Sequence, residues 1–215
     1  MNKHIHPGWF TRIGLIGFGL CVMPAGAAPA AFESAKPGSP PDGWTCGSTG
    51  GGSPRWTVET DPQAPGKARV LKQSGSGTFP WCVKTDTAVA DGWVEVKFKA
   101  VAGKQDQAGG VVWRWQDADN YYVARANALE NNVSLYYTKG GTRHTIAYKD
   151  APVPPNQWHV LRVDFHGAGI RVSLNGKVYI DERDPRITTA GKVGVWTKAD
   201  SVTLFDGFAY ETSPR

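Results

Sequence analysis

Hydrophobic and polar residues alternate in short runs from about residue 55 onward, and turn residues separate the runs. In residues 93–100 (WVEVKFKA), valine and phenylalanine would occupy one face of a strand and charged residues the other. No window of ten or more residues shows a helical period. The pattern indicates an antiparallel β-sandwich or barrel. The predicted strands are 55–59, 69–73, 80–85, 93–100, 110–116, 121–127, 133–139, 142–148, 157–165, 169–174, 177–181, 192–197 and 202–210.

Three short turns set the expected pairing of these strands. Asn175-Gly176, between two alternating runs, is a strong hairpin signal, and Gly140-Gly141 joins 133–139 to 142–148 in the same way. A turn at 117–120 would place Arg114 opposite Val123 and Trp115 opposite Tyr122. The core face would then carry Val111, Trp113, Trp115, Tyr122, Ala124 and Ala126.

The other face of these strands is polar and aromatic. If the strands are neighbours, they form a continuous surface suited to hydrogen bonding with hydroxyls and to stacking on sugar rings. The alternative is an ordinary solvated sheet face. The candidate ligand-binding residues are Arg114, Tyr121, Arg125, Asn127, Tyr136 and Arg143, with Lys198 as an addition.

The N-terminal segment has the pattern of a secretory signal peptide. Lys3 and Arg12 precede an apolar run of about eleven residues, and small residues follow it. That run is too short to span a bilayer, which needs about 20 apolar residues. We expect cleavage after Ala27 or Ala30, and a secreted or periplasmic mature protein without a membrane span. Residues 1–30 would be the signal peptide and 31–215 a single β-sandwich domain, with loops over 34–54, which are rich in Gly, Pro and Ser.

The charge balance argues against nucleic acid as a partner. The chain carries 24 Lys+Arg and 19 Asp+Glu, and two of the positive charges lie in the predicted signal peptide. The remaining basic residues are scattered and form no run.

Cys46 and Cys82 are the two cysteines left after cleavage. An oxidising compartment favours a disulfide between them, and two buried free thiols are the alternative.

Several segments resemble the concanavalin A-like, laminin-G-like jelly-roll domains, nearest to bacterial exported domains labelled 3-keto-disaccharide hydrolase. They are the run 109–133, WHVLRV at 158–163, Asn175-Gly176 and GKVGVWTK at 191–198. The resemblance covers roughly 55–211 and implies an all-β, two-sheet antiparallel sandwich. It does not choose among lectins, binding modules, glycosidases and adhesion domains.

The chain lacks an evident catalytic constellation. The glucanases of the resembled superfamily carry two Glu and one Asp closely spaced on one strand, and residues 181–184 (DERD) come nearest. Adjacent strand residues face opposite ways, so these do not make the required carboxylate pair. We therefore expect a module that binds carbohydrate or another cell-surface polymer. A hydrolase acting on 3-keto-glycosides and a structural or adhesion domain are the alternatives.

A structural Ca²⁺ between Glu33 and Asp206 is also expected. Asp206 shares alternation parity with apolar residues of 202–210, and a buried carboxylate needs a partner. The resemblance implies the partner, since relatives often place calcium between an N-terminal Glu and an Asp of the closing strand. The alternatives are a bulge near Gly207 that turns Asp206 outward and hydrogen bonds from backbone amides to its carboxylate.

Overall fold

The protein is described from a computed structural model, which covers Met1, Phe32, residues 35–66 and residues 69–213. These residues form fourteen strands and no helix. The strands are β1 (Trp44–Ser53), β2 (Trp56–Thr60), β3 (Arg69–Gln73), β4 (Ser76–Lys84), β5 (Gly92–Ala102), β6 (Ala108–Asp117), β7 (Asn120–Asn127), β8 (Asn132–Lys139), β9 (Thr142–Asp150), β10 (His159–His166), β11 (Gly169–Leu174), β12 (Lys177–Arg183), β13 (Lys192–Trp196) and β14 (Val202–Thr212).

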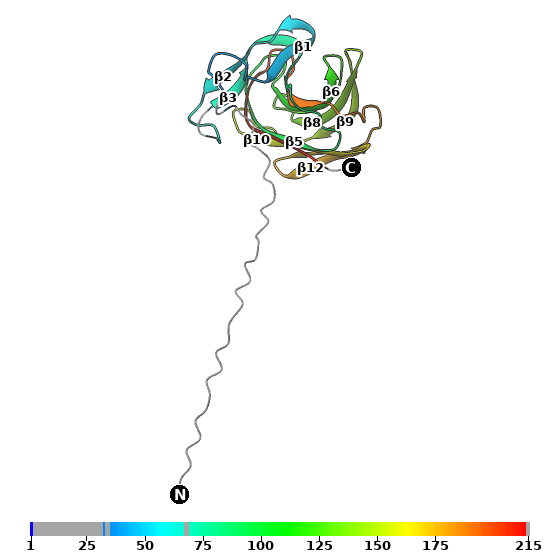
Figure 1. Ribbon diagram of the computed structural model, residues 1–215. Helices are drawn as coiled ribbons and strands as arrows, with labels where there is room; N and C mark the ends of the chain where they lie inside the picture. Colours follow the sequence, from blue (N-terminus) through cyan, green and yellow to red (C-terminus); the bar gives the residue numbers. More distant parts are fainter. Residues whose placement is uncertain (2–31, 33–34, 67–68, 214–215) are drawn as a thin grey trace.

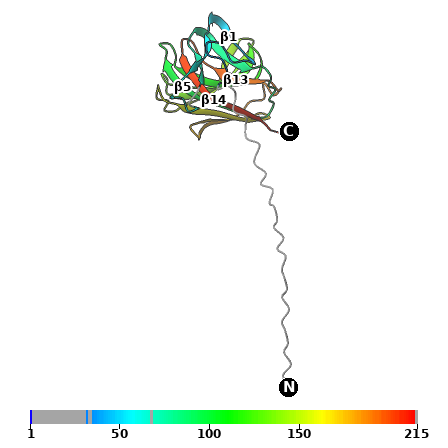
Figure 2. The ribbon, with the colours of Figure 1, turned by 60° about the vertical axis from the view of Figure 1, so that its left-hand side comes forward.

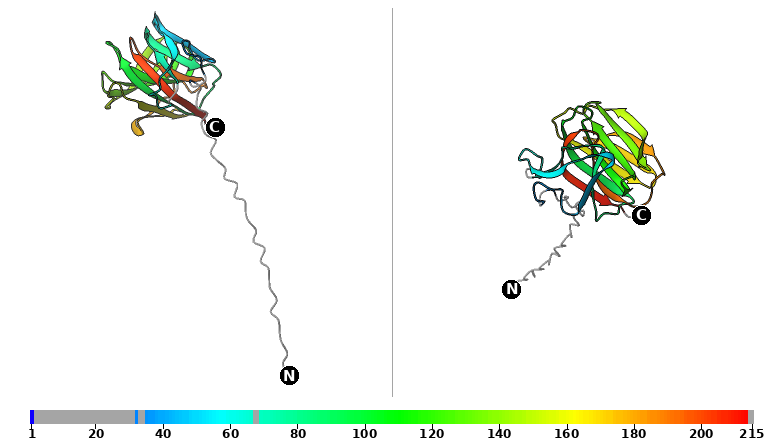
Figure 3. Two further views of the ribbon diagram at one scale, coloured as in Figure 1. Left: turned by 90° about the vertical axis from the view of Figure 1, so that its left-hand side faces the viewer. Right: turned by 90° about the horizontal axis from the view of Figure 1, so that it is seen from above.

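The strands form two seven-stranded antiparallel sheets that lie face to face (Figures 1 and 2). Sheet A has the order β1-β4-β13-β6-β7-β8-β9, and sheet B has the order β12-β11-β10-β5-β14-β3-β2. In the view from above, β6–β9 run side by side across sheet A (Figure 3). The predicted two-sheet antiparallel sandwich is confirmed.

Both predicted two-residue hairpins are present. Asn175 and Gly176 have φ values of 51° and 79°, and the flanking residues Leu174 and Lys177 pair with each other. Positive φ at both central positions is the geometry that matches the twist of the two strands. Gly140 and Gly141 do the same between β8 and β9.

One hydrophobic core fills the space between the sheets. Val94, Val96 and Phe98 of β5 are fully buried in it, as the alternation in 93–100 predicts. Residues of sheet A with the matching parity, such as Val111 and Trp113, meet them from the other side. The core therefore follows from period-two patterning on both sheets.

The predicted loop over residues 34–54 is wrong in its second half, where Trp44–Ser53 forms strand β1. This strand pairs with β4, and Cys46 lies directly opposite Cys82. The two residues form the predicted disulfide, with their Cα atoms 4.0 Å apart. Strand β1 contains four glycines, which have a low propensity for strands, so the sequence alone did not predict it. Its pairing with β4 makes this segment a strand.

The predicted position of Arg114 on the polar face is also wrong. Its φ is 47°, and both pairings of β6 shift register around it, which is the signature of a β-bulge. Trp113, rather than Trp115, lies opposite Tyr122. Trp115 moves out of the core and joins a second apolar cluster on the outer side of sheet A.

Arg114 is fully buried at one end of the sandwich. Its guanidinium donates to the carbonyl oxygens of Ala90, Gly167 and Ile187 at 2.8 Å each and forms an ion pair with Asp91 at 3.2 Å. A side chain with these partners holds loops together and does not face a ligand.

The predicted signal peptide, both cleavage positions and Glu33 lie outside the described residues. None of the described residues belongs to a helix that could span a bilayer.

Candidate functional site

The outer face of sheet A, turned away from the core, carries a second set of buried side chains. Its apolar members are Trp81, Val83, Ala108, Val112, Trp115, Tyr121, Val123, Tyr136 and Trp196. Between them lie polar side chains that are equally buried, including Arg125, Asn127, Ser134 and Thr138. A sheet face that only met solvent would not bury such residues.

This face is buried because sheet A curls into a trough. Arg143 on edge strand β9 reaches Phe79 on β4, with its guanidinium carbon 4.7 Å from the ring centre. Four strands separate β4 from β9 in the sheet order. In a flat sheet their backbones would be about 24 Å apart, at about 4.8 Å per strand. We call this concave outer face the trough.

A network of charged side chains crosses the floor of the trough, and Asp106 is its centre. Both oxygens of this fully buried carboxylate accept from Arg125 at 3.2 Å, and Oδ1 accepts from Asn127 at 2.7 Å. Lys198 lies 2.7 Å from Oδ2. Asp106 comes from the loop before β6, which Asp200 anchors by accepting hydrogen bonds from three successive backbone amides.

Arg125 extends this network to Glu130 through a 2.5 Å ion pair. Asn132 donates to the same Glu130 oxygen, Oε2, at 2.7 Å and also to the hydroxyl of Tyr148. Six residues thus form one unit, which we call the Asp106 network. They are Asp106, Arg125, Asn127, Glu130, Asn132 and Lys198.

The charges of the Asp106 network shift each other's pKa values. Burial raises the pKa of Glu130, but the hydrogen bond from Asn132 and the charge of Arg125 outweigh it, so the net pKa is lowered. Burial lowers the pKa of Arg125, but the side chains of Tyr136, Asp106 and Glu130 more than compensate, and the net pKa is raised. Both groups are therefore charged at neutral pH.

Three aromatic rings surround the guanidinium of Arg143 next to this network. The guanidinium carbon lies 4.2 Å from the ring centre of Tyr136, 4.7 Å from that of Phe79 and 5.8 Å from that of Trp196. The rings of Phe79 and Trp196 are themselves stacked, with centres 5.8 Å apart. Cation–π contacts of this kind fix the side chain and leave its hydrogen-bonding edge for other partners.

A hollow of about 500 Å³ opens in the trough beside Arg143. Glycines of β1 and the start of β4 form one wall, where short or absent side chains leave room. We call it the trough hollow, and its lining residues are Gly51, Gly52, Ser76, Gly77, Thr78, Phe79, Gln105, Arg143, Lys198 and Ala199.

The structure brings together most of the predicted ligand residues. Arg125, Asn127 and Lys198 belong to the Asp106 network, and Tyr136 contacts both Arg125 and Arg143. Tyr121 lies buried beneath them, with its hydroxyl 2.8 Å from the hydroxyl of Thr49. Only Arg114 is elsewhere, for the reason given above.

Sequence reasoning missed several residues of the trough, listed here: Asp106, Glu130, Asn132, Phe79, Trp196 and Tyr148. Parity could have found some of them, since Asn132 is two residues before Ser134 on β8 and Ser134 lies opposite Arg125. No sequence signal points to Asp106 or Glu130, because each lies in a loop whose position depends on tertiary contacts.

The predicted calcium ligand Asp206 is buried on β14 beside a bulge at Gly207, whose φ is 54°. Its two oxygens accept hydrogen bonds from the backbone amides of Gly66 and Gly207, both at 2.6 Å. This is the amide alternative considered from the sequence. The described part of the chain holds no group of three or more His, Cys, Asp or Glu side chains arranged for a metal, and calcium at Asp206 stays a prediction.

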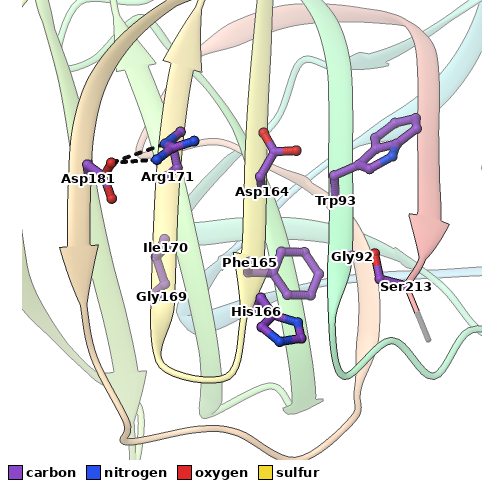
Figure 4. Close-up of a pocket in the computed structure, with 10 residues that line it drawn as sticks. All are labelled: Gly92, Trp93, Asp164, Phe165, His166, Gly169, Ile170, Arg171, Asp181 and Ser213. Atoms are coloured by element: carbon purple, nitrogen blue, oxygen red, sulfur yellow. Dashed lines mark hydrogen bonds and ion pairs between the residues drawn. The ribbon is translucent and has the colours of Figure 1, made fainter. Parts of the chain in front are cut away.

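Sheet B carries a second hollow, of about 380 Å³, on its outer face (Figure 4). Arg171 and Asp181 from neighbouring strands form an ion pair there at 2.8 Å, with more than half of each side chain exposed. The ring of Trp93 is covered by Arg162 at 4.1 Å, and Arg162 pairs with Asp164 at 2.6 Å. The charged groups of this hollow therefore pair with one another at the surface.

Comparison with solved structures places the fold among proteins of the same architecture. The carbohydrate-binding module CBM66 from Bacillus subtilis superposes with a TM-score of 0.66 at 19% identity, over 79% of this chain and 96% of that one. A protein of unknown function with a galectin-like fold, also from Bacillus subtilis, gives 0.60 at 14% identity, over 80% and 90%. The β-glucanase of Bacillus licheniformis gives 0.51 at 13% identity, over 80% and 94%. At these identities the likeness concerns the fold.

A search of curated protein sequences finds no relative of this chain. A family model does match it, over residues 32–206, which include thirteen complete strands and the start of β14. The matched segment contains the whole trough described above. The chain belongs to the family of 3-keto-alpha-glucoside-1,2-lyase-like domains.

Proposed function

We propose that this chain is an exported carbohydrate-binding domain whose ligand lies in the trough. The observation that carries the proposal is the Asp106 network, in which donors and acceptors are assembled beside aromatic rings before any ligand arrives. Preorganised polar groups next to ring faces are what recognition of sugar hydroxyls and of apolar sugar faces requires. Export is expected from the N-terminal segment.

The network leaves groups open to a ligand. Oε1 of Glu130 accepts no hydrogen bond from any described residue, and this side chain is 38% exposed. Lys198 is 29% exposed and uses one of its three donors on Asp106. Tyr148, whose hydroxyl Asn132 holds, is 49% exposed and offers a ring for stacking. One acceptor, several donors and a ring face thus lie along the same surface.

The similar structures support this proposal by their names. One is a carbohydrate-binding module, one a glycosidic hydrolase and one a β-glucanase, and all three share the sandwich at TM-scores above 0.5. The buried Arg125, whose pKa is raised, and Glu130, whose pKa is lowered, are consistent with a surface built to stay ionised while it holds hydroxyls.

A glycan array followed by titration tests the proposal. The mature domain should bind at least one glycan, and Tyr148→Ala and Glu130→Gln should each weaken that binding about fivefold, since each removes one contact of about 1 kcal/mol. Arg171→Ala, which removes an exposed arginine from sheet B, is the matched control and should not change the affinity. Equal losses in all three variants would contradict the trough as the site.

The family description favours a second candidate, cleavage of 3-keto-glycosides. Asp106 and Glu130 are the carboxylates next to the trough hollow that such chemistry could use. An acid catalyst needs a raised pKa, whereas that of Glu130 is lowered, and Asp106 already accepts from three side chains. Incubation with a 3-keto-disaccharide and detection of released monosaccharide would support this candidate over pure binding.

A further inference from the structure

The trough hollow is lined by two cations and by no carboxylate. Arg143 and Lys198 both face it, and its other lining residues are glycines, small hydroxyl side chains, Ala199, Phe79 and Gln105. Surface hollows with ordinary charge balance, such as the one on sheet B, include acids among their lining residues. A hollow lined by cations without acids favours a negatively charged ligand.

Arg143 has no acidic partner in the described part of the chain, since none of the ion pairs there includes it. Its Nη1 atom is shielded from solvent and has no hydrogen-bond partner among these residues. Burial is the main cause that lowers the pKa of Arg143, and the charge of Arg125 adds to it, while Tyr136, Asp106 and Tyr121 oppose the shift. A cation in this position has no anion in direct contact with it among these residues, and the charge of Asp106 acts on it only from beyond ion-pair distance.

The neighbouring charges do not supply that anion. Asp106 and Glu130 already neutralise Arg125 and Lys198 within the Asp106 network. Asp200, the next carboxylate, is occupied with the backbone amides of Lys104, Gln105 and Asp106. The two carboxylates that form ion pairs on the trough floor thus pair with Arg125 and Lys198, and neither they nor Asp200 form an ion pair with Arg143.

We infer that the trough hollow is a subsite for an oxyanion on the sugar, so that the domain selects acidic glycans. Because Nη1 of Arg143 is shielded from solvent, the guanidinium edge left for a ligand is the one formed by Nε and Nη2. Such an edge pairs with a carboxylate or sulfate through two parallel hydrogen bonds, and the ring contacts of Arg143 preset its plane. The open donors of Lys198 would complete the contact. This inference rests on the proposed function and adds the charge of the ligand to it.

Matched polysaccharides test this selectivity. Polygalacturonate is compared with its carboxyl-reduced form, and chondroitin 4-sulfate with its desulfated and its carboxyl-reduced forms, by titration at two salt concentrations. We expect polygalacturonate to bind at least tenfold more tightly than its neutral, carboxyl-reduced form, and chondroitin 4-sulfate to bind more tightly than the derivative that lacks the recognised group. Binding of the acidic members should weaken at the higher salt concentration. The chondroitin series separates carboxylate from sulfate as the recognised group.

Variants separate the subsite from general attraction of a basic protein to polyanions. Arg143→Met keeps an unbranched apolar chain against the three rings but removes the charge, and it should abolish the preference for the acidic member. Arg171→Ala and Lys177→Ala remove the same charge from sheet B and should leave the preference intact. Gly51→Leu adds bulk at a position where a Cβ meets no atom within 4 Å, so it should obstruct the hollow without unfolding the domain.

Each outcome decides a different point. Equal affinity for acidic and neutral members would overturn the acidic subsite and leave carbohydrate binding standing. An acidic preference that Arg171→Ala weakens as much as Arg143→Met would overturn the assignment to the trough hollow. Absence of binding to every acidic and neutral probe would contradict both proposals. If Arg143→Met fails to fold, Arg143→Lys and Gly51→Leu are measured in its place, with weaker acid preference expected in both.

Discussion

The outer faces of the two sheets use the same residue types with different results. On sheet B, Arg171 and Asp181 pair in the open, where solvent screens them (Figure 4). On sheet A, Arg125 and Asp106 form their pair with both side chains almost inaccessible. Exposed pairs contribute about 0–1 kcal/mol, whereas removing one partner of a buried pair costs about 3–5 kcal/mol. Curvature makes the difference, because the curl of sheet A shields its outer face from water.

The largest expected effect comes from breaking the buried pair. Arg125→Ala leaves Asp106 buried beside Asn127 and Lys198 alone, so we expect the free energy of unfolding to fall by about 3–5 kcal/mol. Arg171→Ala should lower it by less than about 1 kcal/mol. Urea denaturation of both variants measures the contrast, and similar losses would show that the trough is not a low-dielectric environment.

Removing the disulfide should have the next largest effect. Cys46 and Cys82 close a loop with a sequence separation of 36, for which chain entropy predicts a loss of about 3–4 kcal/mol. The double variant Cys46→Ala/Cys82→Ala should also weaken ligand binding, because β1 and β4 form the glycine-lined wall of the trough hollow. Intact affinity at a lowered Tm would show that the wall keeps its shape without the bond.

The smallest expected effect concerns how the free energy of unfolding falls at acidic pH. The pKa of Glu130 is lowered in the folded protein, so its stabilising contribution is present above its ordinary value near 4.5. That contribution is lost as pH falls through the lower folded value. Glu130→Gln should therefore be less stable than the wild type at neutral pH, and the difference should shrink as the pH falls below 4.5 through the lower folded value.

Asp181→Asn, on the open face of sheet B, is the control for this titration. Thermal denaturation across the pH range should show a much smaller change for this variant. A Glu130→Gln profile parallel to that of the wild type would mean that the carboxylate does not titrate with folding.

Period-two alternation and the two glycine turns were sufficient to predict the sandwich, because strands such as β5 and β10 bury one face and leave the other partly exposed. Strand β1 was missed since glycine carries no side chain to alternate, and the pairing with β4 that forms this strand is a tertiary property. The disulfide was predictable from the cysteine count together with the expectation of export.

The candidate site was partly predictable from the alternation of side-chain direction along its strands. Arg125, Tyr136 and Arg143 share the outer face because parity holds along β7, β8 and the start of β9. The loop residues Asp106 and Glu130 follow no period, and only the contacts of Asp200 and Arg125 bring them to the trough. The prediction for Arg114 was wrong because a β-bulge interrupts the alternation of side-chain direction in β6.

That bulge in β6 has a consequence for how the family could vary. The bulge reverses the alternation of side-chain direction. Residues after it therefore face the side opposite to the one expected by counting from the residues before it. Trp115 faces the trough, where its ring packs at a tilt against that of Trp81 with ring centres 5.2 Å apart, although a regular strand would direct it inward. Deleting a residue here would exchange inside and outside for the end of β6 without altering the amino-acid composition. A length change at this position can therefore remodel the wall of the trough more than several point substitutions.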